Sequence, residues 1–212
     1  MKVELISHTA EAATLCGKAA AVCTNSKRPE SSLRHAVESG HESVLEHAVF
    51  TFRVTGLSRA ALAQLTRHRL ASFDVQSQRY VRIGGIEPVI PESIRKSCFY
   101  VEAGSLLEDV MNLYQRMVDA GIPAEDARYI TPQAVPTELV MTMNARELRH
   151  FFGLRCCNRA QWEIRQMADE MLKACKKTAP ELFRRSGPGC VSGRCPEKIA
   201  CGTPRRADEW DG

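Results

Sequence analysis

Six arginines lie between Arg53 and Arg82, in a stretch that holds no lysine and a single acid, Asp74. Arginine used without lysine points to geometry rather than solubility, because the planar guanidinium binds phosphate or carboxylate through two parallel hydrogen bonds. The net charge of +4 is too small to indicate nucleic acid by itself. Spacing alone leaves two interpretations open, an anionic ligand and a solvated basic face.

Familiar phosphate and zinc motifs are missing from the sequence. It has no G-x-x-x-x-G-K-[ST] loop, and GPGCVSG at 187–193 misses the dinucleotide fingerprint by one position. HESVLEH at 41–47 has Leu45 where HExxH needs its second histidine. A metal pair of His41 and His47 stays open as the weaker alternative to a structural or substrate-facing role. A nucleotide cofactor would therefore need a different type of site.

The nine cysteines form an odd set. In a cytoplasmic chain they are more typical of thiols or metal ligands than of a disulfide framework. Cys190, Cys195 and Cys201, together with Cys156 or Cys157, could satisfy a tetrahedral zinc ion. Their spacing matches no recognised zinc motif, so we expect no metal and favour reduced thiols, with disulfides as a further alternative.

One segment carries most of the functional information. Arg67–Tyr80 reads RHRLASFDVQSQRY and resembles the signature R-H-R-x-x-S-x-N-x-x-S-x-R of the flavin-dependent thymidylate synthases. Every fixed position matches except the asparagine, which is Asp74 here. Gly40–His47 (G-H-E-x-x-x-E-H) and the region 144–164, which ends in AQWEI, are also similar to that family. The resemblance covers about residues 1–180.

The resemblance implies an activity and its partners. The family methylates dUMP to dTMP, with methylenetetrahydrofolate as carbon donor and FAD, reduced by NADPH, as hydride carrier. It also implies a homotetramer whose active sites are shared between subunits. The cofactor supplies the redox chemistry, so the protein binds, orients and polarises. The alternatives are a non-catalytic nucleotide- or nucleic-acid-binding protein that uses the same arginines, and a metal-dependent hydrolase built on His41, Glu42, Glu46 and His47.

The resemblance further implies residue roles. Arg155 would lie beside the uracil N3/O4 edge and favour the ionised pyrimidine, and His41 would gate or orient the substrate. The implied cofactor-binding residues are Ser43, Arg67, His68, Arg69, Val75, Asn144, Ala145, Arg146 and His150. The implied substrate-binding residues are Gln64, Leu65, Thr66, Arg67, Val75, Gln76, Ser77, Gln78, Arg79, Arg128 and Arg155. Among these, Arg79 and Arg128 would bind the phosphate, and the backbone of 75–78 would donate N–H groups. Asp74 could pair with Arg67 or Arg69, or weaken the attraction for an anion.

Periodicity predicts the elements that position these residues. Residues 2–7 and 48–55 alternate as strands do, and the second strand would bury Ala48, Phe50, Phe52 and Val54. If 71–85 is extended, Val75, Ser77 and Arg79 point the same way. We expect helices up to about Cys23, over 30–39 with Gly40 as the stop, over 102–119 and over 124–129. A long amphipathic helix would bury Ile164, Met167, Met171 and Cys175.

Caps locate three of the helix starts. Ser43 and Glu46 have the spacing of a capping box for a short helix. Ser58 can cap a helix on which Leu62 and Leu65 point inward, while Gln64, Arg67 and His68 form one polar face. Asn144 can cap a helix with Glu147 at its third position.

The fold class follows from this order of elements. We predict an α/β (α+β) domain over 1–185, with a mainly antiparallel sheet flanked by helices, and a flexible Gly/Pro/Cys-rich tail outside the core over 186–212. No apolar run approaches the roughly 18 residues of a membrane span. The N-terminus lacks the apolar region of a signal peptide. The expectation is a cytoplasmic protein without membrane or nucleic-acid partners.

Overall fold

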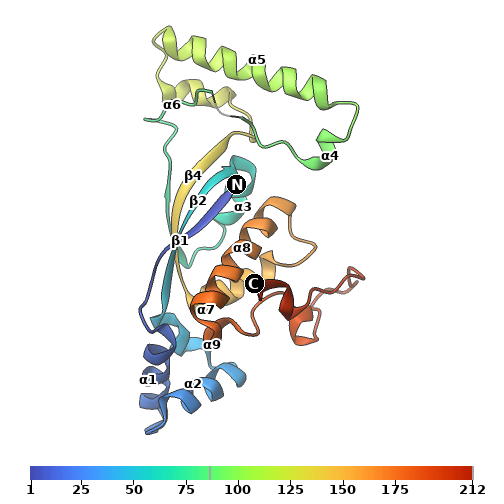
Figure 1. Cartoon of the computed structure of the whole chain (residues 1–212). Coiled ribbons are helices and arrows are strands. Elements are labelled where there is room, and N and C mark those ends of the chain that lie inside the picture. Colours follow the sequence, from blue (N-terminus) through green and yellow to red (C-terminus); the bar gives the residue numbers. More distant parts are fainter. Residues whose placement is uncertain (86, 212) are drawn as a thin grey trace.

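A computed structural model describes residues 1–85 and 87–211. The molecule is elongated, with a sheet at its middle, a helical hairpin at one end and a helical arm at the other (Figure 1). In chain order the elements are β1 (Lys2–His8), α1 (Ala12–Thr24), α2 (Pro29–Glu38), η1 (Glu42–His47), β2 (Val49–Ser58), α3 (Arg59–Leu65), β3 (Ala71–Val75), α4 (Glu92–Arg95), α5 (Tyr100–Asp119), α6 (Ala124–Ala127), η2 (Arg128–Ile130), β4 (Pro136–Asn144), α7 (Ala145–Arg155), α8 (Trp162–Thr178), α9 (Pro180–Phe183), η3 (Gly189–Ser192) and η4 (Ala207–Trp210).

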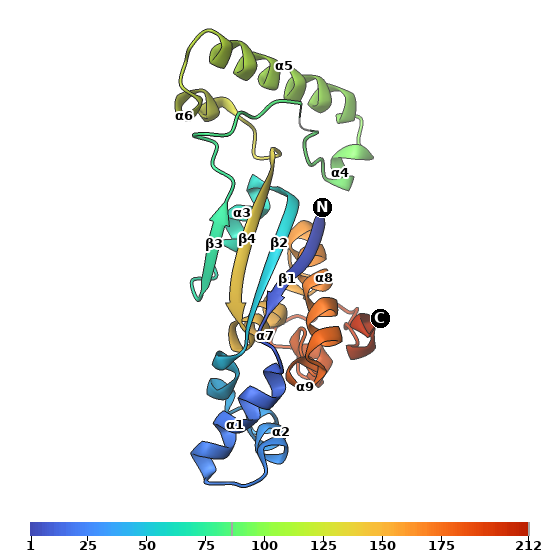
Figure 2. The same ribbon diagram turned by 60° about the vertical axis from the view of Figure 1, so that its left-hand side comes forward.

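The sheet is antiparallel throughout, in the order β1-β2-β4-β3, which confirms the predicted fold class (Figure 2). The strands predicted at 2–7 and 48–55 are β1 and β2. The sequence analysis predicted no element at β4, although β4 is one of the two central strands. Its Leu139, Met141 and Met143 point into the core, as Phe50 and Phe52 of β2 do.

Helices α7 and α8 cover one face of the sheet, and their apolar residues join it in one core. The predicted core positions on α8, from Ile164 to Cys175, are buried. Ser58 caps α3 as predicted, because its Oγ accepts from the Ala61 N–H at 3.1 Å. Ser58 also ties α3 to α8: its N–H and its hydroxyl both donate to the buried Glu163 carboxylate at 2.6 Å.

Three local predictions need correction. The capping box at Ser43 is wrong, because η1 begins at Glu42 with no side-chain cap. The polar face predicted for the helix after Ser58 fails at His68, since α3 ends at Leu65 and the chain then turns His68 into the interior. The extended segment stops at Val75, and the Arg79 N–H donates to Ser77 Oγ in the turn that follows.

The C-terminal segment contributes to the core, contrary to the prediction for 186–212. Trp210 is only 1% exposed and belongs to the main cluster. Its indole N–H donates to Asp169 Oδ1 at 2.9 Å, and the Arg205 guanidinium lies 4.6 Å from its ring centre. Trp210 thus fastens the segment to α8, together with the ion pair of Arg205 with Asp169. The low apolar content of the segment gave no sign of this attachment.

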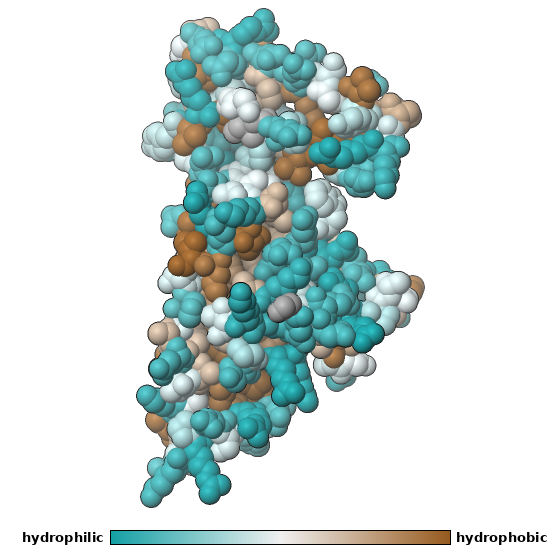
Figure 3. All heavy atoms as spheres, in the orientation of Figure 1, coloured by the Kyte–Doolittle hydropathy of each residue, from teal (hydrophilic) through white to brown (hydrophobic). Residues whose placement is uncertain are grey.

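The arm comprises α4, α5 and α6 with their connecting segments (Figure 1). It has a small core of its own, formed by Ile83, Tyr114, Val118, Ala127 and Val135. Most of α5 lies outside that core, and apolar side chains reach the surface of the arm (Figure 3). Val101 is 80% exposed and Leu106 is 63% exposed. No helix in the described part of the chain combines the length and the apolar character that crossing a membrane requires.

Candidate active site

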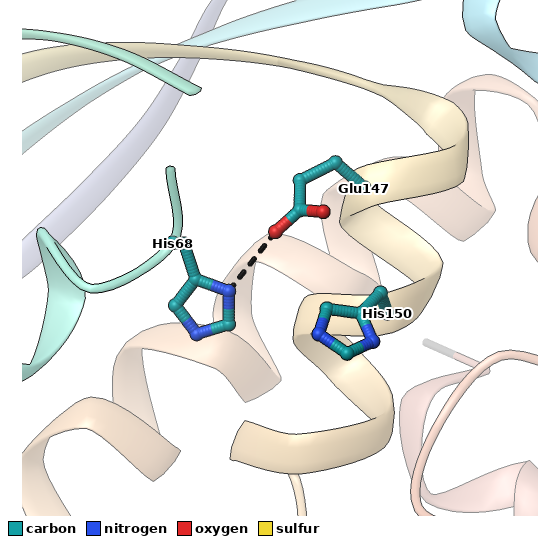
Figure 4. A group of neighbouring side chains, drawn as sticks. All are labelled: His68, Glu147 and His150. Carbon is teal, nitrogen blue, oxygen red and sulfur yellow. Dashed lines mark hydrogen bonds and ion pairs between the residues drawn. The ribbon is translucent and has the colours of Figure 1, made fainter. Parts of the chain in front are cut away.

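His68 is at the centre of a buried polar chain where β3 begins and α7 packs. Its Nδ1 lies 3.0 Å from Glu147 Oε1 (Figure 4). Its Nε2 accepts from Arg155 Nε at 3.0 Å. The Phe151 ring packs edge-on against the imidazole at 4.9 Å. Asn144 caps α7 as predicted, with its Oδ1 accepting from the Glu147 N–H at 2.9 Å. Both ring nitrogens of His68 are therefore engaged inside the protein.

The hydrogen-bond partners fix the protonation state of His68. Arg155 can only donate, so Nε2 carries the lone pair and Nδ1 carries the proton that it gives to Glu147. Burial lowers the pKa of His68, and the hydrogen bond with Glu147 only partly opposes this. The imidazole is therefore neutral at pH 7.

The atoms of His68, Glu147 and His150 lie within 4.8 Å of one another, which is close enough for a shared metal ion. A protonated Nδ1 has no lone pair for a metal, so we derive no metal site from this group. No other such cluster occurs within 1–85 and 87–211, and the tail cysteines suggested for zinc are therefore not gathered around one point.

Arg155 is half-buried, and burial, followed by the charge of Arg67, lowers its pKa. Arg67 and Arg69 are exposed and belong to none of the ion pairs of the described residues. His150 is exposed, with its ring 6.0 Å from that of His68. We call this group, Arg67, His68, Glu147, His150 and Arg155, the α7 end. It combines a fixed guanidinium with further cationic side chains at the surface.

Two of the remaining predicted cofactor residues, Arg146 and Ala145, already form contacts within the protein. Arg146 pairs with Glu46 on the surface, a contact of small energetic value. Ala145 is buried, and its N–H donates to Ala48 O at 2.8 Å. Asp74 is exposed opposite Val140 of β4, and it forms no ion pair with Arg67, Arg69 or any other described residue.

A second group of polar side chains lies where β3 ends and α6 packs. Arg79 pairs with Glu125 at 2.7 Å, and Arg59 Nη2 donates to Gln76 O at 2.9 Å. Arg59 Nε and Gln78 Nε2 are buried and make no hydrogen bond within the described residues. Burial and the charge of Arg128 lower the pKa of Arg59. We call Arg59, Gln78, Arg79 and Arg128 the α6 end.

Arg59 was not among the predicted site residues. Its signal was its place in the lysine-free arginine stretch, directly after the Ser58 cap. Two buried N–H groups without partners next to a second arginine are unusual, because burying an unpaired polar group is costly. The α6 end thus has donors that an anion could satisfy.

Some predicted substrate residues have side chains or backbone groups that are buried or hydrogen-bonded within the protein. Leu65 is fully buried and does not offer its side chain to a ligand in this state. Thr66 is exposed, but its hydroxyl proton is donated to Leu62 O, so the hydroxyl could only accept from a ligand. The Gln76 N–H donates to Glu138 O at 2.9 Å and is not available to a phosphate. Gln64 and Ser77 are partly exposed.

His41 and Ser43 lie at a hollow of about 560 Å³ between η1 and the α1–α2 hairpin. Hydroxyl groups and a second histidine line it, through Ser26, Ser31, Ser32 and His35. η1 is fixed to α7 by the pair of Glu42 with Arg149 at 2.9 Å. η1, which forms one wall of the hollow, is therefore fixed to α7.

The register of β3 shows that the two ends are far apart in one chain. Ala71 pairs with Met143 near α7, whereas Val75 pairs with Leu139 toward α6. The four steps from Ala71 to Val75 span about 14 Å at 3.4 Å per residue. The structure therefore brings Arg67, His68, His150 and Arg155 together, and it leaves Arg79 and Arg128 at the opposite end.

Comparison with known proteins agrees with the arginine pattern. A family profile described as "Thymidylate synthase complementing protein" matches residues 4–181. A protein of Geobacter sulfurreducens named "Flavin-dependent thymidylate synthase" is 46% identical over 222 residues, which cover 95% of this chain and 94% of that protein. The chain belongs to the flavin-dependent thymidylate synthase family.

Other relatives carry the same name. A Clostridium tetani protein is 38% identical over 235 residues, covering 95% of this chain and 93% of the relative. A Pyrococcus horikoshii protein is 49% identical over 179 residues, covering 80% and 74%. These matches confirm the family that the Arg67–Tyr80 motif predicted, which is a family of methyltransferases. The name of the family also supports the predicted flavin cofactor.

Proposed function

We propose that this chain catalyses the reductive methylation of dUMP to dTMP, with methylenetetrahydrofolate as carbon donor and FAD, reduced by NADPH, as hydride carrier. The observation that carries the proposal is the fixed guanidinium of Arg155 in a chain of this family. Its Nε is held by His68, and neither Nη hydrogen-bonds to another described residue. The two Nη groups are thus available to the N3/O4 edge of a uracil.

Arg155 would act by charge. A guanidinium beside N3 and O4 favours the ionised pyrimidine, and negative charge in the ring makes C5 a better nucleophile. Because the arginine stays charged, it moves no proton itself. Its partial burial strengthens the interaction, since the local dielectric is lower than that of water.

The dUMP phosphate would bind at the α6 end. Arg79 and Arg128 are the predicted phosphate ligands, and Arg59 adds a buried Nε that lacks a partner. A phosphate would satisfy this donor and offset the proximity of Arg59 to Arg128. Gln78, with its own unpartnered Nε2, would complete the anion site.

FAD would bind around Arg67 and Arg69, whose exposed charges suit a pyrophosphate. His150 and Arg146 of α7 would line the rest of its site, together with Asn144 at the end of β4. Val75, which lies at the other end of β3, would approach the cofactor from a neighbouring subunit. FAD, when bound, supplies the hydride. Arg146 would exchange its surface contact with Glu46 for the cofactor at little cost.

The hollow at His41 and Ser43 offers room for a planar ring between η1 and the α1–α2 hairpin. His41 stands at the start of η1 with an exposed side chain, so it can turn toward or away from that space. We assign to it the gating or orienting of substrate at the flavin ring, with Ser43 as a hydrogen-bonding partner of the cofactor.

We also propose a homotetramer with shared active sites. The two ends lie beyond opposite ends of β3, whose first and last residues are about 14 Å apart, so one dUMP cannot easily reach both in a single chain. If the α6 end of one subunit met the α7 end of another, phosphate and uracil sites would be adjacent. The apolar residues exposed on the arm, including Val101 and Leu106, support burial against another subunit.

The division into a catalytic domain over 1–185 and an appended segment over 186–212 stays part of this proposal. The family match at 4–181 supports it. The contacts of Trp210 and Arg205 with Asp169 give the segment a fixed place on α8.

A visible absorbance spectrum tests the proposed function. The protein should retain an oxidised-flavin spectrum after incubation with FAD and desalting, and the spectrum should shift when dUMP is added. Production of dTMP on addition of methylenetetrahydrofolate and NADPH would complete the test. A colourless protein that cannot be reconstituted would instead favour nucleotide binding without catalysis.

A further inference from the structure

Glu147 is a buried acid that the predicted roles leave unused. Its carboxylate is almost inaccessible to solvent, and Oε1 accepts from His68 Nδ1 at 3.0 Å. Its own N–H is held by Asn144 at the start of α7. The residue is therefore held both at its backbone and at its carboxylate. Burying a carboxylate is unfavourable unless it is hydrogen-bonded.

The hydrogen bonds run in one direction from this carboxylate. Glu147 accepts the proton on Nδ1, so Nε2 of the neutral ring carries the lone pair that accepts from Arg155 Nε. The opposite tautomer would place an N–H on Nε2, facing the N–H of Arg155. Two donors cannot share one hydrogen bond, so that tautomer would displace the guanidinium.

We propose that Glu147 is a positioning residue, which sets the tautomer of His68 and thereby the orientation of Arg155. This inference rests on the proposed function, because it places Arg155 at the uracil. His68 then serves as a connector whose two nitrogens are used inside the protein, so that any contact with FAD uses its ring face or backbone. The arrangement resembles an acid orienting a metal-bound histidine, with a guanidinium in place of the metal.

Glu147→Ala and Glu147→Gln separate this role from simple packing. Glutamine keeps an oxygen that can accept from Nδ1–H, whereas alanine leaves Nδ1 without a partner and frees the ring to change tautomer. We expect Glu147→Ala to lower kcat by about 10- to 100-fold with little change in the KM for dUMP, and Glu147→Gln to restore kcat to within about threefold. Glu170→Ala, which removes an exposed acid from α8, is the control.

A second readout does not depend on activity. Solid-state ¹⁵N spectra of histidine-labelled protein without ligands report the tautomer of each ring, and the signal of His68 is assigned by its loss in His68→Asn. The wild type should have a protonated Nδ1 and an unprotonated Nε2 at His68. Glu147→Gln should keep this pattern and Glu147→Ala should lose it.

The outcomes discriminate between the two proposals. A wild-type His68 protonated at Nε2, or equal kcat values for the Ala and Gln variants, would overturn the positioning role. A change confined to KM would overturn it as well. If the wild type forms no dTMP, the proposed function fails, while the spectra still decide whether Glu147 sets the tautomer.

Discussion

The α7 end and the α6 end use the same kind of side chain in opposite ways. At the α7 end, Arg155 is held by a neutral histidine that a buried carboxylate orients. At the α6 end, Arg59 has a buried Nε without a described partner, and Arg79 has only an exposed pair with Glu125. At the first, no buried side-chain donor of the described residues lacks a partner, and the free donors face outward. The second has donors that remain to be satisfied.

The contrast between a fixed guanidinium and unpartnered donors indicates the role of each end. A fixed guanidinium is pre-organised, so little reorganisation is needed when charge develops on a bound ring. Unsatisfied donors instead favour binding of an anion, because the anion removes a desolvation cost that the fold already bears. We therefore expect mutations at the α7 end to change kcat and mutations at the α6 end to change affinity.

The largest expected effect is a loss of stability when the C-terminal segment, which supports the α7 end, is detached from α8. Trp210→Ala removes a buried indole and should lower the free energy of unfolding by roughly 3–5 kcal/mol. Arg205, which stacks on Trp210, also donates to the carbonyl of Cys156, next to Arg155. Chemical denaturation measures the loss. Trp162→Ala, at the start of α8, is the control and should cost less, since Trp162 is 38% exposed. Equal losses would contradict the fastening role of the C-terminal segment.

Arg155→Ala should lower dTMP formation by about 10²- to 10³-fold while FAD content stays constant, because a donor to developing charge is removed. Single-turnover rates and the flavin absorbance of the purified protein measure both quantities. Arg184→Ala, at an exposed arginine, is the control. Normal turnover by Arg155→Ala would remove the proposed role and the main contrast between the two ends.

Arg79→Ala should weaken dUMP binding by about 10- to 100-fold, the value of one charge-assisted hydrogen bond, without changing flavin content. Calorimetry with dUMP and with deoxyuridine, which lacks the phosphate, sharpens the test. Only the affinity for dUMP should fall. A parallel loss for deoxyuridine would show that Arg79 does not act on the phosphate.

The smallest expected effect is a pH dependence of stability. Burial lowers the pKa of His68 below its ordinary value of 6.5, against the partial opposition of Glu147 and with Arg155 and His150 adding to the lowering. The unfolded chain then binds more protons below pH 6.5, so stability is full above this pH and declines below it, by at most about 1.4 kcal/mol per pH unit.

Denaturation between pH 5 and 8 measures this slope, with other titrating groups contributing equally to both proteins in a comparison. His68→Asn should reduce this slope relative to the wild type. An unchanged slope in His68→Asn would contradict a neutral, buried His68.

Parts of the fold could be predicted because their patterns were local. β2 alternates aromatic and β-branched residues with polar ones, and Ser58 and Asn144 are strong caps. β4 was missed because its buried face uses Leu139, Met141 and Met143, residues that favour helices as much as strands. Pairing with β2 and β3 on both sides decides its conformation.

The candidate site was predicted in type but not in arrangement. The Arg67–Tyr80 motif identified the family, yet helical spacing placed His68 on an exposed face. The end of α3 at Leu65 reversed that placement and made His68 a partner of Glu147. The separation of Arg79 from Arg155 follows from strand register, which depends on contacts distant in sequence.

Subunit complementation tests the central claim, that the two ends of different chains form one active site. Arg155→Ala and Arg79→Ala are co-expressed with different tags, doubly purified, and assayed for dTMP at dUMP concentrations below KM. Each variant alone should be nearly inactive. If sites are shared, about one quarter of the sites in mixed assemblies combine two intact ends, and a corresponding fraction of wild-type activity should return. If both ends serve the same site within one chain, no site is intact and activity stays at the level of the single variants.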